Sequence, residues 1–562
     1  MEPGVTSEAW NADAESPAHA PASEAPITEH PLYGFLEACA GLLGDGLDHP
    51  EAWAALCDLS AAHRGALREL ITGILGFQAP PLRKVMALLL ALIEVIDGDR
   101  VRGMASLRQL EAHFSLCPQV AGAIFFAERH GDPARTADLS DRFCDAPFVK
   151  FETLIDGTVA PCCSIWTQKR LGRLDEMSAE QIWNGADAQE MRESILDGSF
   201  RFCNKQRCTY IREDALPRRA EVTDPVLRGV IADHSTALTH PPRWLFLAHD
   251  STCNLACPSC RGELMSASEA EERRFDIIEQ EVFEPMLARG ALTLSLSGQG
   301  DPFASHHYRS ILKRLAAHDY ELELDLHTNG LLLSPERWTA YAGLEKYRPL
   351  VNVSIDACTA EVYKIVRRPG KWEKLAANLA FIAEKRAAGV FREFHMNATI
   401  QLDNFHQMPA LIDFARQLGA DSMRLYMMQH TGAHLSADYA RKNVADRTHP
   451  LHLAFLETLR DPALGTSTAH LYDVAGWRDQ ALAESLPSDA LRDDADYQAW
   501  LDAIDAAIGA EQLGVVIALC VAGRRRFAEP LLHEIEAQAL RRLGFTLQAS
   551  YRDADRARAF GA

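Results

Sequence analysis

The feature that most constrains the fold is a run of six short β-type segments that alternate with amphipathic helical segments between residues 244 and 429. These segments are WLFLAHD, LTLSLSG, LELDLHT, LVNVSID, FHMNATIQL and SMRLYMM. Strands that alternate with helices form parallel sheets, because each helix carries the chain back across the sheet. The pattern therefore predicts an α/β fold with a parallel sheet, open or curled into part of a barrel. In such folds the chemistry gathers at the carboxyl ends of the strands.

Three cysteines with the spacing C-x3-C-x2-C directly follow the first of these segments, within STCNLACPSCRGE. They are Cys253, Cys257 and Cys260, and the polar and proline residues between them indicate a turn rather than a buried helix face. A closed zinc site needs a fourth Cys or His ligand, and His249 is the only close candidate. Three thiolates better suit an iron–sulfur cluster that leaves one iron open to a further ligand.

Composition and cysteine usage exclude several classes of partner. Asp and Glu outnumber Lys and Arg by 78 to 57, which gives a formal charge of −21. So acidic a chain has no general attraction to phosphate backbones, and we expect no nucleic-acid partner. The N-terminus lacks the features of a signal peptide, and VMALLLALIEVI is too short to span a bilayer. We therefore expect no membrane partner and a reducing cytoplasm, where clustered cysteines bind metal rather than form disulfides.

The local composition and hydrophobic periodicity of the chain predict six regions. Residues 1–30 are rich in Ala, Pro, Glu and Ser, which predicts a disordered tail. Residues 31–136 show helical periodicity and predict a helical domain that could be repeat-like. The remaining regions are a cysteine-rich unit at 137–215, a linker at 216–243, the β/α core at 244–435 and a helical C-terminal region at 436–562.

The β/α core resembles the radical SAM superfamily, whose fold is a partial (β/α)6 TIM-like barrel. The resemblance rests on the three-cysteine loop and on motifs that follow in order at predicted strand ends: SGQGDP, HTNG and SIDACTAEVYKIVRRPGKWEKLAANL. It implies a [4Fe–4S] cluster whose open iron binds S-adenosylmethionine (SAM). The reduced cluster of that family cleaves SAM to methionine and a 5′-deoxyadenosyl radical. Such a radical attacks nearby C–H bonds, so it needs an enclosed site that excludes water.

The resemblance also implies roles for particular residues. The implied cluster ligands are Cys253, Cys257 and Cys260, and the implied SAM-binding residues are Gly300, Asp301, Ser354 and Asn404. Gln299 and Asp301 replace the commoner Gly and Glu of the family's Gly-Gly-Glu-Pro-like motif, a departure that keeps the carboxylate. Ser259 stands where the family often has an aromatic residue that packs against the adenine, so the adenine must be held by other residues.

A second group of cysteines lies upstream of the core. Cys144, Gly157 and Cys162 reproduce the start of the SPASM motif, C-x9–15-G-x4-C. Here the unit precedes the radical SAM core, and its later cysteines are too few for two clusters. The resemblance therefore implies one auxiliary [4Fe–4S] cluster, with the ligands Cys144, Cys162, Cys203 and Cys208. Cys163 could exchange roles with Cys162, and spacing alone does not separate this site from a four-cysteine zinc site.

One further thiol, Cys358, lies one residue past SIDA and is therefore predicted near the radical site. Radical epimerases need a hydrogen donor opposite the face from which hydrogen is abstracted, and the weak S–H bond of a thiol can supply it. The alternative is a small buried residue at a strand end. The sequence is compatible with both a hydrogen donor and a small buried residue at Cys358.

These features predict an oxygen-sensitive, cytoplasmic radical SAM/SPASM-type oxidoreductase or epimerase. The predicted reaction is hydrogen abstraction during maturation of a ribosomally made peptide or protein. The alternatives are a radical epimerase or oxidoreductase that acts on a sugar or aminoglycoside-like molecule, and a non-catalytic iron–sulfur binding protein. The expected partners are the substrate and an electron donor such as flavodoxin or ferredoxin. The intact triad and the carboxylate of Asp301 argue against the non-catalytic alternative.

Overall fold

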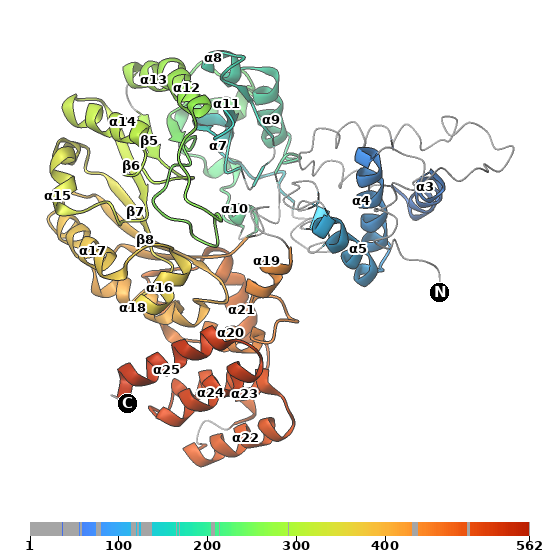
Figure 1. Ribbon diagram of the computed structural model, residues 1–562. Coiled ribbons are helices and arrows are strands. Elements are labelled where there is room, and N and C mark those ends of the chain that lie inside the picture. Colours follow the sequence, from blue (N-terminus) through green and yellow to red (C-terminus); the bar gives the residue numbers. More distant parts are fainter. Residues whose placement is uncertain are drawn as a thin grey trace, which may run out of the picture.

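The computed structural model describes residues 59–74, 80–113 and 138–560, apart from 165, 168, 204–207, 213, 290–291, 430–435 and 492–494, and a few single positions before residue 128. Figure 1 shows a group of helices near the N-terminus, a sheet with its covering helices, and a second group of helices near the C-terminus. The predicted tail at 1–30 lies outside the described residues.

The central sheet has ten strands in the order β10-β9-β8-β7-β6-β5-β4-β1-β2-β3. Its six central strands pair in parallel and coincide with the six predicted segments. They are β4 (Trp244–Leu247), β5 (Leu292–Leu296), β6 (Leu322–Thr328), β7 (Leu350–Ser354), β8 (Glu393–Ile400) and β9 (Ser422–Met427). The predicted α/β fold with a central parallel sheet and helical flanks is confirmed.

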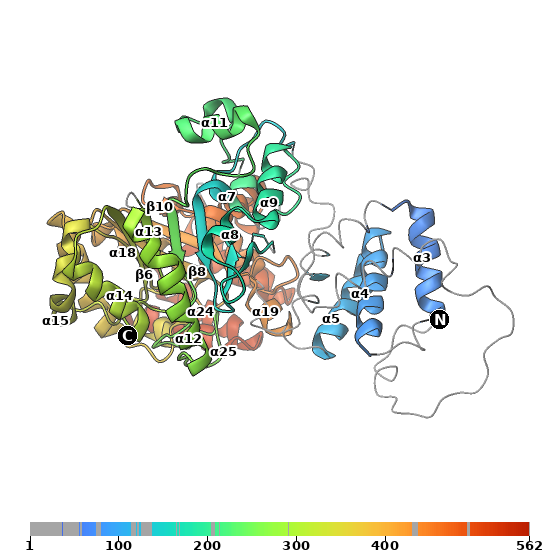
Figure 2. The same cartoon turned by 90° about the horizontal axis from the view of Figure 1, so that it is seen from above.

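The sheet has one apolar and one polar face, because successive side chains of a strand point to opposite sides. Leu245, Leu294, Leu324, Val351 and Phe394 form part of the apolar face and are fully buried. Helices between the strands cover this face, as Figure 2 illustrates for several of them. They are α12 (Glu269–Ile278), η7 (Glu279–Phe283), α13 (Glu284–Arg289), α14 (His306–Ala317), α15 (Pro335–Trp338), η8 (Thr339–Tyr347), α16 (Ala360–Val366), α17 (Trp372–Ala387), η9 (Phe405–Gln407) and α18 (Met408–Gln417).

The opposite side of the sheet is called here the polar face. Its residues lie in register across neighbouring strands: His327 of β6 pairs with Asn352 of β7, which pairs with His395 of β8. A sheet that is covered by helices on both faces has strands that are apolar throughout. The polar residues therefore distinguish this face from the apolar face that the helices cover.

The cysteine-rich unit extends the same sheet. Strand β1 (Lys150–Thr153) pairs in parallel with β4, and β2 (Thr158–Ala160) and β3 (Gly172–Arg173) continue it in antiparallel fashion. The helices of this unit are α7 (Ala146–Val149), α8 (Ala179–Trp183), α9 (Ala186–Leu196) and α10 (Thr209–Arg212). The region predicted as a linker contains η6 (Arg219–Glu221) and α11 (Pro225–Asp233). The sequence motifs do not reveal this continuity, because the pairing of β1 with β4 joins segments far apart in the chain.

The flanks are helical, as predicted. Near the N-terminus, α3 (Ala61–Ile74), α4 (Pro80–Ile96) and α5 (Arg100–His113) form a core of their own. The C-terminal elements share the core of the sheet. They are α19 (Ser436–Lys442), α20 (His452–Leu459), η10 (Pro462–Gly465), β10 (Ala469–His470), η11 (Tyr472–Val474), α21 (Ala475–Ala483), η12 (Pro487–Ala490), α22 (Tyr497–Gly509), α23 (Leu513–Arg524), α24 (Pro530–Arg542) and α25 (Thr546–Phe560). Within the described part of the chain, no helix is both long and apolar enough to cross a membrane.

Candidate functional site

The three-cysteine loop leaves the carboxyl end of β4 and is tied down by backbone hydrogen bonds. The Cys253 N–H donates to the carbonyl of Met265 (3.1 Å), and the Cys260 N–H donates to the carbonyl of Cys257 (2.8 Å). The Ala256 N–H donates to the carbonyl of Arg368 (2.6 Å), which lies beyond β7. The loop is therefore anchored both within itself and to a distant part of the chain.

Each sulfur of this loop lies beside a nitrogen donor from a side chain. The pairs are Asn329 Nδ2 with Cys253 Sγ at 3.7 Å, Arg367 Nη1 with Cys257 Sγ at 3.8 Å, and Arg261 Nε and Nη2 with Cys260 Sγ at 3.5 Å. Donors of this kind favour a charged thiolate over a neutral thiol. They also tune iron–sulfur centres, because hydrogen bonds to the sulfurs affect the reduction potential.

The two arginines are held in place by other groups. The Arg367 Nε forms an ion pair with the buried Asp356 carboxylate at 2.8 Å. The Arg261 Nη1 donates to the carbonyl of Ser251 at 2.6 Å, and its Nη2 donates to the carbonyl of Gln299. Both guanidinium groups are thus fixed before any ligand binds, which reduces the ordering needed for binding.

Burial acts against ionisation of these thiols. It raises the pKa of Cys253 from 9.0 to about 11 and also raises the pKa of Cys257. The positive charge of Arg367 acts in the opposite direction on Cys257. Metal ligands must be deprotonated, so iron binding is coupled to release of these protons. The arginines supply the positive charge that this step requires.

The SGQGDP motif packs against the start of the three-cysteine loop. A Cβ atom on Gly300 would lie 2.5 Å from the carbonyl oxygen of Thr252, so only glycine fits here. The Asp301 N–H donates to the same carbonyl at 2.9 Å. The carboxylate of Asp301 is fully buried and accepts hydrogen bonds from the Thr328 hydroxyl and the Asn329 N–H, both at 2.8 Å. Asp301 therefore joins the ends of β5 and β6 beside the cysteines.

Burial raises the pKa of Asp301, whereas the hydrogen bonds that it accepts from Asn329 and Thr328 lower it.

Ser297, at the start of this motif, has φ 65°, and Asp356, just beyond β7, has φ 55°. Left-handed backbone is uncommon for residues other than glycine and often occurs at functional sites. Both residues lie at the strand ends where SAM binding is predicted.

The other two predicted SAM-binding residues occupy different settings. Ser354 ends β7 on the polar face, where it pairs in register with Asn397. Asn404 is fully buried, and its amide nitrogen donates to the carbonyls of Asp356 and Thr399, both at 2.8 Å. Asn404 thus ties the segment after β8 to the end of β7. A direct contact between Asn404 and SAM stays a prediction.

His249, considered as a fourth ligand, turns away from the cysteines. Its ring bonds to the Thr153 hydroxyl at 2.7 Å and lies against Phe275, His307 and Tyr308. It follows β4, which ends at Leu247. Burial lowers its pKa well below the ordinary value. The ring is thus already packed and bonded on the β1 side.

The four predicted auxiliary ligands lie together around one small cavity. Cys144, Cys162, Cys203 and Cys208 line it with Trp166, Met191, Phe200, Ile211 and Leu216, among others. Cys163 is not among its lining residues. Burial raises the pKa of Cys144 to about 12 and raises the pKa of Cys162 well above its ordinary value. The cavity is thus a predominantly apolar site with four sulfurs around it, a donor set that fits a four-iron cluster.

Cys358 lies outside both groups of cysteines. Its backbone N–H donates to the Gln407 side chain at 3.1 Å, and its thiol lies near the charged Asp555 and Arg558 of α25. Burial raises the pKa of this thiol to about 12. The protonated thiol is the form that a hydrogen donor would need. Its role as a donor stays a prediction.

Three residues of the loop environment were not assigned from the sequence: Asn329, Arg261 and Arg367. Each lies in a quoted motif, HTNG, CRGE or VRRPG respectively. The signal that could identify them is a donor side chain next to a motif at a strand end, because strand ends of a parallel sheet converge.

Among the described residues, no three His, Cys, Asp or Glu side chains lie close enough to hold a single metal ion.

Comparison with known proteins matches two segments of the chain to families. Residues 144–209 match the family model SPASM, an iron–sulfur cluster-binding domain, and residues 249–400 match the radical SAM superfamily. The SPASM segment thus precedes the radical SAM segment, as predicted. A radical SAM domain implies a [4Fe–4S] cluster and SAM, and a SPASM domain implies auxiliary iron–sulfur binding. The donor sets described above fit both groups.

The chain is similar to an AdoMet-dependent heme synthase of Methanosarcina barkeri, with 29% identity over 199 residues, which are 35% of this chain and 53% of that protein. The chain thus spans about half the length of this curated relative. Similar solved structures include Streptococcus suis SuiB bound to precursor peptide SuiA (15% identity, TM-score 0.30, 52% of this chain and 63% of that chain). Another is anSMEcpe with bound AdoMet (18% identity, TM-score 0.28, 41% of this chain and 61% of that chain).

Proposed function

We propose that the chain is a radical SAM enzyme in which Cys253, Cys257 and Cys260 hold the catalytic cluster and a substrate binds against the polar face of the sheet. Cluster and SAM together supply a 5′-deoxyadenosyl radical that takes a hydrogen atom from the substrate. The observation that carries this proposal is that each sulfur of the loop has its own nitrogen donor. A loop with only a structural role would not need three such donors.

The chain's own residues have separable tasks in this proposal. Arg261, Arg367 and Asn329 stabilise the thiolates and fix their orientation, as outer-shell partners of metal ligands do. Asp301 holds the ends of β5 and β6 against the loop. Gly300 allows the backbone to pass within contact distance of Thr252. Together these contacts create a preformed edge at which SAM can bind with little reorganisation.

For the auxiliary site we propose a cluster with four protein ligands, Cys144, Cys162, Cys203 and Cys208. Four thiolates leave no iron open to substrate, so the role we propose is transfer of an electron rather than substrate binding. The apolar residues around the cavity limit access of water, and exposure to solvent is one of the factors that set the potential of such a centre.

The substrate that we propose is a ribosomally made peptide or protein, because SPASM-type enzymes most often modify peptides. The similarity to an AdoMet-dependent heme synthase favours a second candidate, a small molecule rather than a peptide. We also propose that an electron donor such as flavodoxin or ferredoxin reduces the catalytic cluster. Whether the outcome is oxidation or epimerisation depends on the fate of the substrate radical.

The experiment is anaerobic reconstitution of the full chain with iron and sulfide, followed by addition of SAM and dithionite. We expect 5′-deoxyadenosine and methionine from the wild type and none from Cys257→Ala. Cys520→Ala is the matched control, because Cys520 is a buried thiol in α23, in the C-terminal flank. A reconstituted wild type that binds iron but yields no 5′-deoxyadenosine would support a non-catalytic iron–sulfur protein instead.

A further inference from the structure

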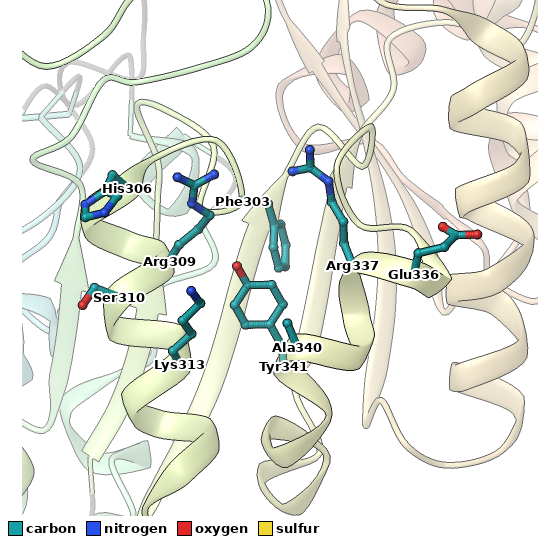
Figure 3. Close-up of a pocket in the computed structure, with 9 residues that line it drawn as sticks. All are labelled: Phe303, His306, Arg309, Ser310, Lys313, Glu336, Arg337, Ala340 and Tyr341. Atoms are coloured by element: carbon teal, nitrogen blue, oxygen red, sulfur yellow. The ribbon is translucent and has the colours of Figure 1, made fainter.

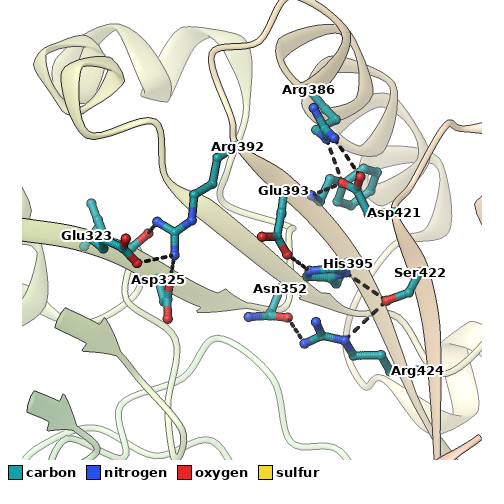
Figure 4. A network of polar contacts seen from close by, with 12 residues as sticks. Glu323, Asp325, Asn352, Arg386, Arg392, Glu393, His395, Asp421, Ser422 and Arg424 are labelled. Atoms are coloured by element: carbon teal, nitrogen blue, oxygen red, sulfur yellow. Dashed lines mark hydrogen bonds and ion pairs between the residues drawn. The ribbon is translucent and has the colours of Figure 1, made fainter. Parts of the chain in front are cut away.

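The polar face carries several charged side chains, and most of them have a partner of opposite charge. The pairs are Lys150 with Glu152 at 2.7 Å and Arg392 with Asp325 at 2.6 Å. The Glu393 carboxylate instead forms a hydrogen bond with the His395 ring at 2.6 Å. Figure 4 shows the Arg392–Asp325 pair and the contact between Glu393 and His395. Lys150 also lies over the rings of Trp244 and Phe246, at 4.8 Å from each centroid.

Arg424 of β9 differs from the other charged residues of this face. Its Nη1 donates to the amide oxygen of Asn352 at 2.8 Å, and its Nε donates to the hydroxyl of Ser422 at 3.3 Å. Both partners are buried and neutral. Among the residues that the structure describes, no carboxylate forms an ion pair with Arg424. The guanidinium is thus held in a fixed position without being neutralised (Figure 4).

The charge of Arg424 lies near the middle of the polar face. Its guanidinium reaches across β8 to Asn352 of β7, which pairs in register with His327 of β6. Burial, together with the positive charges of Arg424 and Lys150, lowers the pKa of His327 to about 4. Burial and Arg424 also lower the pKa of His395. Near pH 7 both imidazoles are therefore neutral, and the Arg424 guanidinium is held by the neutral side chains of Asn352 and Ser422.

A pocket elsewhere in the molecule is also lined by several cations. It has a volume of about 400 Å³ and lies between α14 and α15, and its lining includes Arg309, Lys313 and Arg337 (Figure 3). Most of the cations there are exposed to solvent, where water already stabilises their charge. Arg424 is half-buried and its hydrogen-bond partners Asn352 and Ser422 are buried. A cation in that setting gains more from an anionic ligand.

We propose that Arg424 binds a carboxylate group of the substrate and thereby orients the substrate on the polar face. The planar guanidinium matches a carboxylate in a two-point contact. One uncompensated positive charge suits a singly charged carboxylate, since Lys150 and Arg392 are already paired. This inference rests on the proposed function, because that function places the substrate on this face. The carboxylate could belong to a peptide or to a small organic acid.

The test measures binding of benzoate to the full reconstituted chain by thermal shift, with benzamide as the uncharged isostere. Ligands that bind the native state raise its stability. We expect benzoate, but not benzamide, to raise the melting temperature of the wild type. Arg424→Gln should weaken benzoate binding at least tenfold, and Arg424→Lys should retain part of it. Arg386→Gln is the matched control, because Arg386 is paired with Asp421 and should leave benzoate binding unchanged.

An equal benzoate shift in Arg424→Gln and the wild type, or no shift in the wild type, would overturn the inference. A second arm compares the blocked tripeptides acetyl-Ala-Glu-Ala-amide and acetyl-Ala-Gln-Ala-amide. Arg424-dependent binding of the Glu peptide that is tighter than that of benzoate identifies a peptide carboxylate as the source, and the reverse order identifies a small acid. These measurements do not involve SAM cleavage. A negative result here with 5′-deoxyadenosine still formed would therefore overturn this inference and leave the proposed function intact.

Discussion

The two groups of cysteines differ in what surrounds their sulfurs. Around Cys253, Cys257 and Cys260 lie two guanidinium groups and one amide, each within 3.8 Å of a sulfur. Around Cys144 and its three partners lies a small cavity with aromatic and aliphatic walls. One environment is polar and anchored to several strand ends, and the other is apolar and closed.

These two environments suit two centres with different tasks on one sheet. Polar donors beside three sulfurs stabilise charge that changes when a further ligand binds, which suits a site with an open iron. An apolar cavity with four sulfurs favours a centre that keeps its ligands. Because β1 of the auxiliary unit pairs directly with β4, both centres share one rigid frame.

Cys257→Ala should have the largest effect on function. Removal of one of three ligands leaves the catalytic cluster without stable attachment, so 5′-deoxyadenosine formation should be lost. About four irons should remain per chain, held by the auxiliary cysteines. Iron and sulfide analysis with product quantification checks this. Retention of SAM cleavage would contradict the assignment of the triad.

The next largest effect is expected for Cys162→Ala, which should remove about four irons per chain and leave the triad cluster in place. Cys163→Ala is its matched control, since Cys163 does not line the cavity although it is adjacent. We expect Cys163→Ala to retain the iron content of the wild type. If Cys163→Ala instead loses about four irons per chain and Cys162→Ala keeps them, Cys163 rather than Cys162 is the ligand.

Arg367→Met tests the donors around the triad. We expect the mutation to lower SAM cleavage about 10- to 100-fold, as loss of an outer-shell partner typically does. The iron content should stay close to that of the wild type. Arg416→Met, at an exposed pair with Asp413, is the control and should have no effect. An unchanged rate and an unchanged reduction potential for Arg367→Met would show that the donor is dispensable.

A smaller effect concerns the pH dependence of the cluster-free chain. Burial raises the pKa of Cys144 from 9.0 to about 12 in the folded protein. Between these values the unfolded state binds fewer protons than the folded state, so stability should fall as pH rises from about 9 toward 12. Denaturant unfolding at several pH values checks this. Cys144→Ala should reduce the slope, and an unchanged slope would argue against burial of this thiol.

The smallest effect on SAM cleavage is expected for Cys358→Ala. The charged groups nearest to the thiol are Asp555 and Arg558 of α25, and the thiol is not one of the proposed cluster ligands, so 5′-deoxyadenosine formation should remain intact. If Cys358 is the predicted hydrogen donor, turnover to an epimerised product should be lost while abstraction continues. Product analysis in deuterated water distinguishes these results. Unchanged turnover would end the donor hypothesis.

The sequence predicted the elements whose signals are local. The six central strands appear in β-type segments, and the three-cysteine motif falls at the expected strand end. The pairing of β1 with β4 and of β10 with β9 has no local signal, because it joins segments far apart in the chain. The same holds for Arg367, which reaches Cys257 across 110 residues of sequence. Side-chain partners from distant motifs require the fold before they can be identified.

The most direct test of the contrast is electron paramagnetic resonance of the reduced centres before and after addition of SAM. In Cys162→Ala, which keeps the triad cluster, we predict that SAM changes the spectrum, because the open iron gains a ligand. In Cys257→Ala, which keeps the auxiliary cluster, we predict no change. A spectrum in Cys257→Ala that responds to SAM, or one in Cys162→Ala that does not, would contradict the assignment of an open and a closed centre.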